Sequence, residues 1–220
     1  MRRALVLGAS GALGSSIVSE LEHRGWAVDR GGRGSGADVD VTADDWWSGV
    51  GPYDGVVWAQ GRNSRGGVGD TTSDDLLAVY EANVVFVSAT LRRLLDAGAL
   101  IEPARGVVIS SIWQITARAD KIAYVASKAA LGGLVPAIAA DLPGRFAING
   151  VLPGVIDTPM TRSQLSPEQV AGVEGATPGG RLASPGDVAN AVAWLLDSSA
   201  AGINGQWIAV DNGWSGVRSV

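Results

Sequence analysis

Short apolar runs alternate with longer segments of helical period along nearly the whole chain. Segments 4–7 and 106–110 are continuous apolar runs, which is typical of strands that are covered on both faces of a sheet. Segment 13–24 repeats its apolar residues every three or four positions, which is the spacing of an amphipathic helix. This alternation predicts an α/β fold with one Rossmann-like, doubly wound parallel sheet of about seven strands and helices on both faces.

The remaining elements are expected from the same two periods and from turn residues. Strands are expected at 26–28, 38–41, 55–59, 146–152 and 207–210, and helices at 44–50, 73–98, 122–142 and 185–196. Segments 30–37 and 61–72 are rich in glycine and are expected to be loops, whereas 157–180 is expected to be irregular or weakly helical. Because no repeat or linker interrupts the pattern, residues 1–220 are expected to form a single domain.

Composition excludes several classes of function. The net charge is −5, and an acidic surface repels phosphate backbones, so no nucleic-acid partner is expected. The chain has no cysteine and one histidine, His23, so neither a metal site nor a Ser-His-Asp triad is expected. No run of 18 apolar residues is uninterrupted, so no membrane-spanning helix is expected, and the cytoplasm is the expected location.

Glycines cluster in the string GASGALG at 8–14, between the first expected strand and the first expected helix. A tight turn there needs the positive φ open to glycine, and it lets a pyrophosphate approach the backbone at the helix N-terminus. The placement favours a dinucleotide site over a plain strand–helix turn, and no Gly-Lys-Ser/Thr follows that would indicate a P-loop. The expected cofactor contacts in this string are Gly8, Ser10, Gly11, Leu13 and Gly14.

The string DRGGR at 29–33 bears on which nicotinamide cofactor binds. Recognition of NAD uses an acid about 20 residues beyond the glycines, whereas Asp29 lies 15 residues beyond Gly14 and is expected inside the second strand. A guanidinium can bind a 2′-phosphate through two hydrogen bonds, so Arg30 and Arg33 favour NADP(H) over NAD(H). The alternative is that both arginines are solvated loop charges.

Tyr124 and Lys128 are four residues apart at the start of the expected helix 122–142, so they share one helix face. A free tyrosine has a pKa of about 10, and a neighbouring ammonium favours the phenolate and lowers that pKa. Tyr124 then becomes a usable general acid or base. The alternative is an ordinary surface pair, because this spacing also occurs by chance.

A set of motifs spread along the chain gives these residues a context. Besides the glycine string and the Tyr124/Lys128 pair, Ser110-Ser111 closes an expected strand 13 residues before Tyr124, and Pro-Gly-x-x-x-Thr occurs at 153–158. With these motifs the chain resembles the short-chain dehydrogenase/reductase family over nearly its whole length. Segments that look like further family motifs are Asp40-Val41, Ala59-Gln60-Gly61, Asn83 and the last strand at 205–213.

The resemblance implies roles for these residues. Tyr124 would exchange the proton at the substrate oxygen, and Ser111 would hydrogen-bond that oxygen. Lys128 would bind the nicotinamide ribose and lower the pKa of Tyr124, and Asn83 would anchor a water that links Lys128 to solvent. The cofactor contacts implied outside the glycine string are Asp40, Val41, Ala59, Gly61, Tyr124, Lys128, Pro153, Gly154, Ile156 and Thr158, with Arg30 and Arg33 added from the residues themselves.

Two features depart from the commonest family pattern. The glycines are spaced Gly-x-x-Gly-x-x-Gly rather than Gly-x-x-x-Gly-x-Gly, so Ala12 stands where the middle glycine usually falls. Trp58 replaces the first Asn at the end of the fourth strand, which predicts the loss of a supporting hydrogen bond.

The substrate pocket is expected to be lined by Trp113, Gln114 and Met160, although core packing is the alternative for all three. Segment 159–180 lies next to the expected site and is a candidate lid. No charged cluster in the sequence demands a carboxylate or a phosphate, so a neutral carbonyl or alcohol substrate is favoured. A homodimer or homotetramer through the two long helices is implied by the resemblance.

The sequence therefore predicts an NADP(H)-preferring oxidoreductase that interconverts a carbonyl and an alcohol by hydride transfer, with Tyr124 as general acid/base. Two alternatives stay open. The glycine spacing also fits a dehydratase or epimerase of the same family. A non-catalytic NADP(H)-sensing regulator would keep the glycine string but would not need Asn83, Ser111, Tyr124 and Lys128 together.

Overall fold

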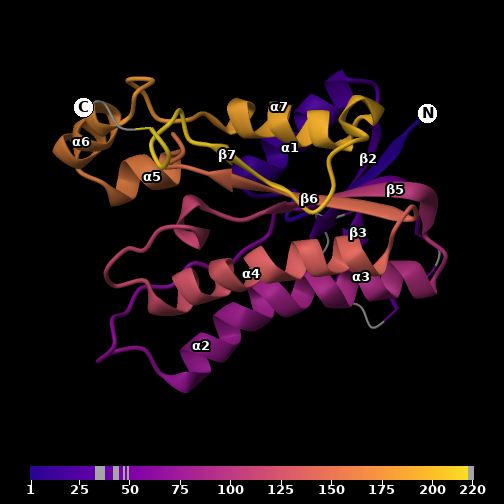
Figure 1. The fold of residues 1–220 in the computed structure, drawn as a ribbon, viewed down its shortest axis with the longest axis horizontal. Helices are drawn as coiled ribbons and strands as arrows, with labels where there is room; N and C mark the ends of the chain where they lie inside the picture. Colours follow the sequence, from indigo (N-terminus) through magenta and orange to yellow (C-terminus); the bar gives the residue numbers. More distant parts are fainter. Residues whose placement is uncertain (33–37, 42–44, 47, 49, 218–220) are drawn as a thin grey trace.

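The computed structural model describes residues 1–32, 38–41, 45, 46, 48 and 50–217, and these form one seven-stranded sheet (Figure 1). The strands stand in the order β3-β2-β1-β4-β5-β6-β7, and every neighbouring pair is parallel. Their bounds are β1 Arg3–Leu7, β2 Ala27–Gly32, β3 Val39–Asp40, β4 Tyr53–Trp58, β5 Leu100–Ile109, β6 Phe146–Pro153 and β7 Trp207–Val210. The predicted doubly wound parallel sheet is confirmed. Its strand order reverses between β1 and β4, and ligands of such sheets bind at the carboxyl ends beside that point.

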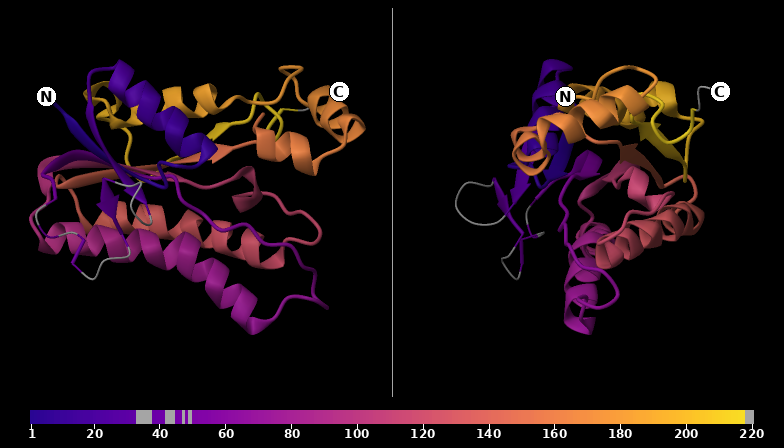
Figure 2. Two further views of the ribbon diagram at one scale, coloured as in Figure 1. Left: turned by 180° about the vertical axis from the view of Figure 1, so that it is seen from behind. Right: turned by 90° about the vertical axis from the view of Figure 1, so that its left-hand side faces the viewer.

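Helices cover both faces of the sheet, as predicted (Figures 1 and 2). Helices α1 (Ala12–His23) and α7 (Pro185–Leu196) pack on one face, and α3 (Phe86–Asp96) and α4 (Ile122–Asp141) pack on the other. The two-residue period of β1 explains the two cores. Ala4 and Val6 lie in the cluster under α1 and α7, whereas Leu5 and Leu7 lie in the cluster under α3 and α4.

Strand β2 corrects the prediction of a loop at 30–37, because its pairing continues to Gly32. Gly31 pairs with Leu7 of β1 and with Val39 of β3. A Cβ built on Gly31 would lie 2.7 Å from Cδ2 of Leu7. Close packing against a neighbouring side chain, rather than a turn, therefore accounts for this glycine.

Two other stretches differ from expectation. Asp45, Trp46 and Ser48 lie in turns, and the rest of the helix expected at 44–50 falls mostly outside the described residues. Segment 157–180 contains two helices, α5 (Pro159–Gln164) and α6 (Pro167–Ala176). Each begins with proline after a capping hydroxyl, from Thr158 and Ser166, which are helix-start signals that the expectation of an irregular segment overlooked.

The long helix expected at 73–98 is present but is not a regular α-helix throughout. It consists of α2 (Ser73–Tyr80), a π-helical turn η1 (Glu81–Val85) and α3. Thr72 and Asp75 form a capping box at its start. Single π-turns inside α-helices often mark functional sites, and this one contains the buried Asn83.

Helix α4 is the one described helix that is long and apolar enough, by length and composition, to cross a membrane. A core helix passes the same test. Leu131 and Val135 of α4 are buried in the cluster with Phe146 and Ile148 of β6, so α4 is a partly buried core helix. Short 3₁₀ turns at Ile112–Gln114 (η2) and Ser198–Ala200 (η3) complete the described elements.

Candidate active site

Four side chains that sequence reasoning singled out converge at the carboxyl edge of the sheet. Tyr124 and Lys128 project from the first two turns of α4, Ser111 follows β5, and Asn83 lies in the π-turn. The Lys128 Nζ atom lies 5.7 Å from the Tyr124 ring centroid and donates a 3.1 Å hydrogen bond to the Ile109 carbonyl. Gly61 lies next to both Asn83 and Lys128, since a Cβ on it would lie 3.4 Å from Asn83 Oδ1 and 3.6 Å from Lys128 Nζ.

Asn83 is held rigidly by its neighbours. Its Oδ1 accepts a 2.7 Å hydrogen bond from the Arg62 backbone N–H, and its Nδ2 donates to the Arg62 carbonyl at 3.0 Å and to Ser127 Oγ at 2.8 Å. Ser127 Oγ in turn donates to the Tyr124 carbonyl at 2.8 Å. The π-turn is thereby tied both to the strand end after β4 and to the first turn of α4.

The electrostatics of the Tyr124/Lys128 pair differ from the sequence-based expectation. Burial raises the pKa of the Tyr124 phenol, while a side-chain hydrogen bond with Ser111 lowers it, and the net pKa is raised. Burial lowers the pKa of Lys128 to about 8, because the residue is only 4 % exposed and no described carboxylate forms an ion pair with it. The hydrogen bond with Ser111 is thus an interaction that favours the phenolate.

The glycine string forms the turn that its composition predicts. Gly8 has a φ of +82°, and a Cβ on it would lie 2.6 Å from the Gln60 backbone nitrogen. A Cβ on Gly14 would lie 2.1 Å from the Gly8 carbonyl oxygen, so α1 packs directly on the end of β1. Gly11 starts α1 without a side-chain cap, whereas α2, α6 and α7 all have one. The first-turn N–H groups of α1 thus remain open to an anion, and the turn fits a dinucleotide pyrophosphate.

The residues expected to bind the adenosine end of the cofactor differ in whether they are free to do so. Arg30 forms a 2.6 Å ion pair with Glu22 of α1 and lies 3.8 Å from Asp38, so acids already neutralise it. Arg33 lies outside the described residues. Asp29 bonds to Arg3 and to the Tyr53 hydroxyl, inside β2 as expected. Asp40 ends β3, paired with Gly32, and the Val41 N–H donates to the Gly32 carbonyl.

A cavity of about 1080 Å³ lies beside these groups, and residues of α5 and α6 form part of its lining. Many predicted contacts line it: Gly11, Leu13, Ala59, Ser111, Tyr124, Pro153, Gly154, Ile156 and Thr158. Of the predicted substrate contacts, Trp113 and the 65 % exposed Met160 line the cavity. Gln114 instead lies against Gly132 of α4, where a Cβ on Gly132 would be 3.4 Å from its Nε2.

Sequence reasoning missed several lining residues. They belong to the loops after β4 and β5, to α5 and α6, and to the chain after β7, and they include Asn63, Arg65, Ser110, Arg118, Asp120, Lys121, Gln169, Val173 and Trp214. The available signals were the position of the loop residues after strand carboxyl ends and, for Gln169 and Val173, the candidate lid at 159–180. Trp214 packs edge-on against Trp113, with ring centroids 5.6 Å apart, so the chain after β7 closes one wall of the cavity.

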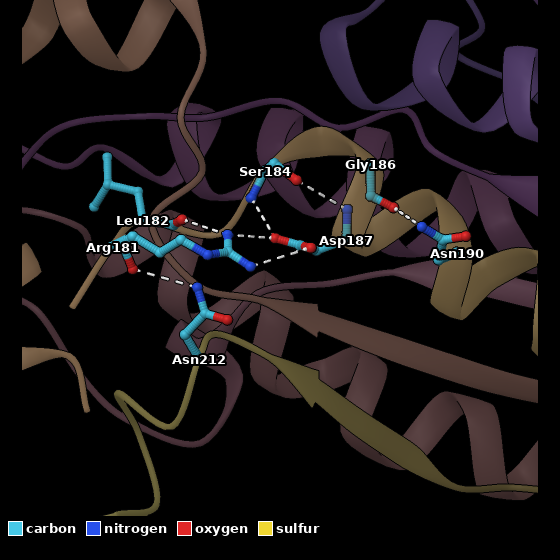
Figure 3. A network of polar contacts seen from close by, with 7 residues as sticks. All are labelled: Arg181, Leu182, Ser184, Gly186, Asp187, Asn190 and Asn212. Carbon is cyan, nitrogen blue, oxygen red and sulfur yellow. Dashed lines mark hydrogen bonds and ion pairs between the residues drawn. The ribbon is translucent and has the colours of Figure 1, made fainter. Parts of the chain in front are cut away.

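The segment with α5 and α6 is anchored where it joins α7 (Figure 3). Ser184 and Asp187 form a capping box at the start of α7, and Arg181 makes a 2.7 Å ion pair with Asp187. The Arg181 carbonyl also accepts a hydrogen bond from Asn212 Nδ2. This network fixes the end of the candidate lid to both α7 and the chain after β7.

Comparison with known proteins supports the same interpretation. Residues 34–215 match the family model described as enoyl-(acyl carrier protein) reductase. The chain is 30 % identical to the uncharacterized oxidoreductase YmfI of Bacillus subtilis (97 % of this chain and 98 % of the relative) and 32 % identical to cyclopentanol dehydrogenase of a Comamonas species (91 % and 85 %). It is also 30 % identical to the 3-oxoacyl-acyl-carrier-protein reductase FabG of Escherichia coli (96 % of each). Among solved structures, an actinorhodin polyketide ketoreductase with NADPH superposes with a TM-score of 0.87 at 25 % identity, over 98 % of both chains.

Proposed function

Because this chain belongs to the short-chain dehydrogenase/reductase family and is an oxidoreductase of alcohol and carbonyl groups, we propose that it is an NADP(H)-preferring enzyme with Tyr124 as its general acid/base. The observation that carries this proposal is that four groups meet at one end of the sheet. Asn83 and Lys128 lie beside Gly61, Lys128 also lies beside the Tyr124 ring, and Tyr124 and Ser111 are hydrogen-bonded and line the cavity. Structural roles alone would not require all four groups at one sheet edge.

A bound nicotinamide would supply or accept the hydride, and the chain would handle the proton. In the direction of reduction, Tyr124 would donate its phenolic proton to the substrate oxygen, and Ser111 would donate a hydrogen bond that stabilises the charge developing on that oxygen. Lys128 would hold the cofactor ribose through its ammonium, next to Tyr124. Asn83 would fix the helix turn that carries the pair, through Ser127 and the Tyr124 carbonyl.

The Tyr124→Phe variant tests the proposed acid/base. The ring and its packing are kept, so cofactor binding should persist while NADPH oxidation with a panel of ketones falls by at least about 100-fold. Tyr80→Phe, on the exposed side of α2, is the matched control and should retain the wild-type rate. An unchanged rate in Tyr124→Phe would refute the assignment.

The NADP(H) preference rests on Arg33, because Arg30 is engaged by Glu22 and Asp38. The related ketoreductase solved with NADPH supports the same preference. Arg33→Ala is therefore expected to weaken NADPH binding by about ten-fold and leave NADH binding unchanged. Arg30→Ala should affect both cofactors equally and weakly. Equal losses for both cofactors in Arg33→Ala would contradict the proposal.

We also propose a homodimer or homotetramer that works in the cytoplasm on a small molecule. The exposed side of α4 is built from small apolar residues, including Ala126, Ala129, Gly133 and Ala137, and α2 exposes Leu77 beside it. Such a face suits close packing against a second copy. Light scattering of Ala129→Glu against wild type tests the assembly, and cell fractionation tests the location.

A further inference from the structure

Three cations line the cavity that holds Tyr124. Arg65 comes from the loop after β4, and Arg118 and Lys121 come from the loop between η2 and α4. Backbone contacts join the two loops, since Gly66 bridges Lys121 and its N–H donates to the Asp120 carbonyl at 3.0 Å. All three residues line the same cavity, and the charges of Arg118 and Arg65 both lower the pKa of Lys121, after the larger effect of burial. We call Arg65, Arg118 and Lys121 the basic cluster.

The basic cluster forms no ion pair with an acid of the described residues. Many arginines of the described chain form ion pairs with acids, among them Arg2, Arg24, Arg92, Arg145, Arg162 and Arg181. Within the described residues no acid lies within ion-pair distance of the cluster. The one acid in the cavity lining is Asp120, whose Oδ1 lies over Gly67. Arg65 and Arg118 are exposed and Lys121 is half-buried, so all three positive charges are accessible to an anion that enters the cavity.

Lys121 is the member of the basic cluster nearest to the chemistry. Its Nζ lies 5.9 Å from the Tyr124 ring centroid. Two of its three donors are used, at 2.8 Å to Asn63 Oδ1 and at 2.9 Å to the Ser64 carbonyl. An ammonium held in this way has one donor left. Arg118 is placed further out, with its guanidinium over the Trp113 ring at 5.9 Å from the centroid.

We propose that the substrate carries an anionic group, a carboxylate or a phosphate, which Lys121, Arg118 and Arg65 bind while the carbonyl or alcohol reaches Tyr124. The proposal rests on the proposed function and names its substrate class. It replaces the neutral compound favoured from the sequence, which does not show that Arg65, Arg118 and Lys121 line one cavity. Because Lys121 lies close to Tyr124, the anion and the reacting carbon should be a few bonds apart, as in a short oxo or hydroxy acid.

The test compares each anion with its neutral partner at low ionic strength. The pairs are 2-, 3- and 4-oxo acids against their methyl esters, and hydroxyacetone phosphate against hydroxyacetone. In wild type the anionic member of at least one pair should have a kcat/KM at least about ten-fold higher than its neutral partner, mainly through KM. Which pair shows this distinguishes carboxylate from phosphate. In Lys121→Met and in Arg118→Gln the ratio within that pair should fall by about ten-fold. Arg92→Gln, on the outer side of α3, is the control and should keep the ratio.

Anion binding by the NADP⁺ complex gives a second readout that does not depend on turnover. Titration of succinate and of inorganic phosphate by calorimetry should show at least about ten-fold tighter binding of one of them to wild type than to Lys121→Met. Equal binding to both proteins, together with equal use of charged and neutral substrates, would overturn the proposal. Preference for a carrier-protein thioester alone, with no stronger binding of free anions, would also overturn it. Failure of the Tyr124→Phe test is a separate result, because it would remove the proposed function itself.

Discussion

Replacing the buried lysine of the site, in the variant Lys128→Met, is expected to make the protein more stable at neutral pH. Burial lowers the pKa of Lys128 from 10.5 in the unfolded chain to about 8 in the folded one. Folding at pH 7 therefore forces a charged ammonium into an unfavourable environment, at a cost of about 3 kcal/mol when each pKa unit counts for about 1.4 kcal/mol. Losing the hydrogen bond to the Ile109 carbonyl offsets about 1 kcal/mol of this, so the net gain is about 2 kcal/mol.

The sign of this effect can be checked through its pH dependence. The folded pKa is depressed, so between pH 8 and pH 10.5 the unfolded chain binds the extra proton and wild-type stability rises with pH. The gain from Lys128→Met should accordingly shrink to within about 0.5 kcal/mol of zero at pH 9.5.

Urea unfolding of both proteins at pH 7 and pH 9.5, followed by tryptophan fluorescence, measures this difference. Lys121→Met is the matched control, since Lys121 is less buried and donates two hydrogen bonds, and no gain is expected there. A Lys128→Met protein that is less stable than wild type at pH 7, or a gain that is the same at both pH values, would refute the reasoning.

Three further predictions concern packing and capping. Gly14→Ala should destabilise the fold by about 1–3 kcal/mol and weaken NADPH binding, because its Cβ would lie 2.1 Å from the Gly8 carbonyl oxygen. Gly175→Ala, in α6 and with open space around it, is the control in thermal melts and cofactor titrations. Thr90→Val should lower the free energy of unfolding, measured in urea, by about 1–3 kcal/mol. Trp58 Nε1 donates to Thr90 Oγ1 at 2.6 Å and would be left buried without an acceptor. The control Ser88→Ala, at an exposed position, should leave the stability unchanged. Asp187→Asn should cost about 1 kcal/mol at pH 6, after allowance for solvent screening of the Arg181 pair. The hydrogen bond from Arg181 is the main cause that lowers the pKa of Asp187 to about 2, so the cost of the substitution should disappear as the pH falls toward 2. A stability difference between variant and wild type that is undiminished at pH 2.5 would contradict this prediction.

Periodicity predicted the sheet and its two helical layers because each strand and helix carries its own burial pattern. The alternating neighbours of β1 and the apolar face of α1 are readable without any tertiary contact. β2 is the exception. Gly31 and Gly32 resemble loop residues, and only the packing of Leu7 against Gly31 shows why glycine belongs in a strand there.

In the candidate site, too, local sequence patterns were predictable and tertiary contacts were not. The glycine string and the Tyr124/Lys128 pair are local patterns, so the sequence was sufficient to find them. The basic cluster joins two loops more than 50 residues apart, and the ion pair of Arg30 with Glu22 depends on how α1 lies beside β2. Neither contact produces a periodic pattern in the sequence. The first changes the substrate that is proposed, and the second changes which arginine is proposed to bind the cofactor. The pKa of Tyr124 also depended on burial that spacing alone does not measure.

The π-turn between α2 and α3 changes the direction in which side chains point around the axis of one long helix. Each residue of an α-helix advances by about 100°, so the wider turn lets α2 keep its face toward α4 while Val87, Leu91 and Leu94 of α3 face the sheet. Deleting one residue from 81–85 would restore regular α-helical hydrogen bonding. It would also rotate either the buried face of α2 away from α4 or the buried face of α3 away from the sheet. Insertions and deletions in this stretch should therefore be far less tolerated than ordinary substitutions, although it is a helix with no break visible in its sequence.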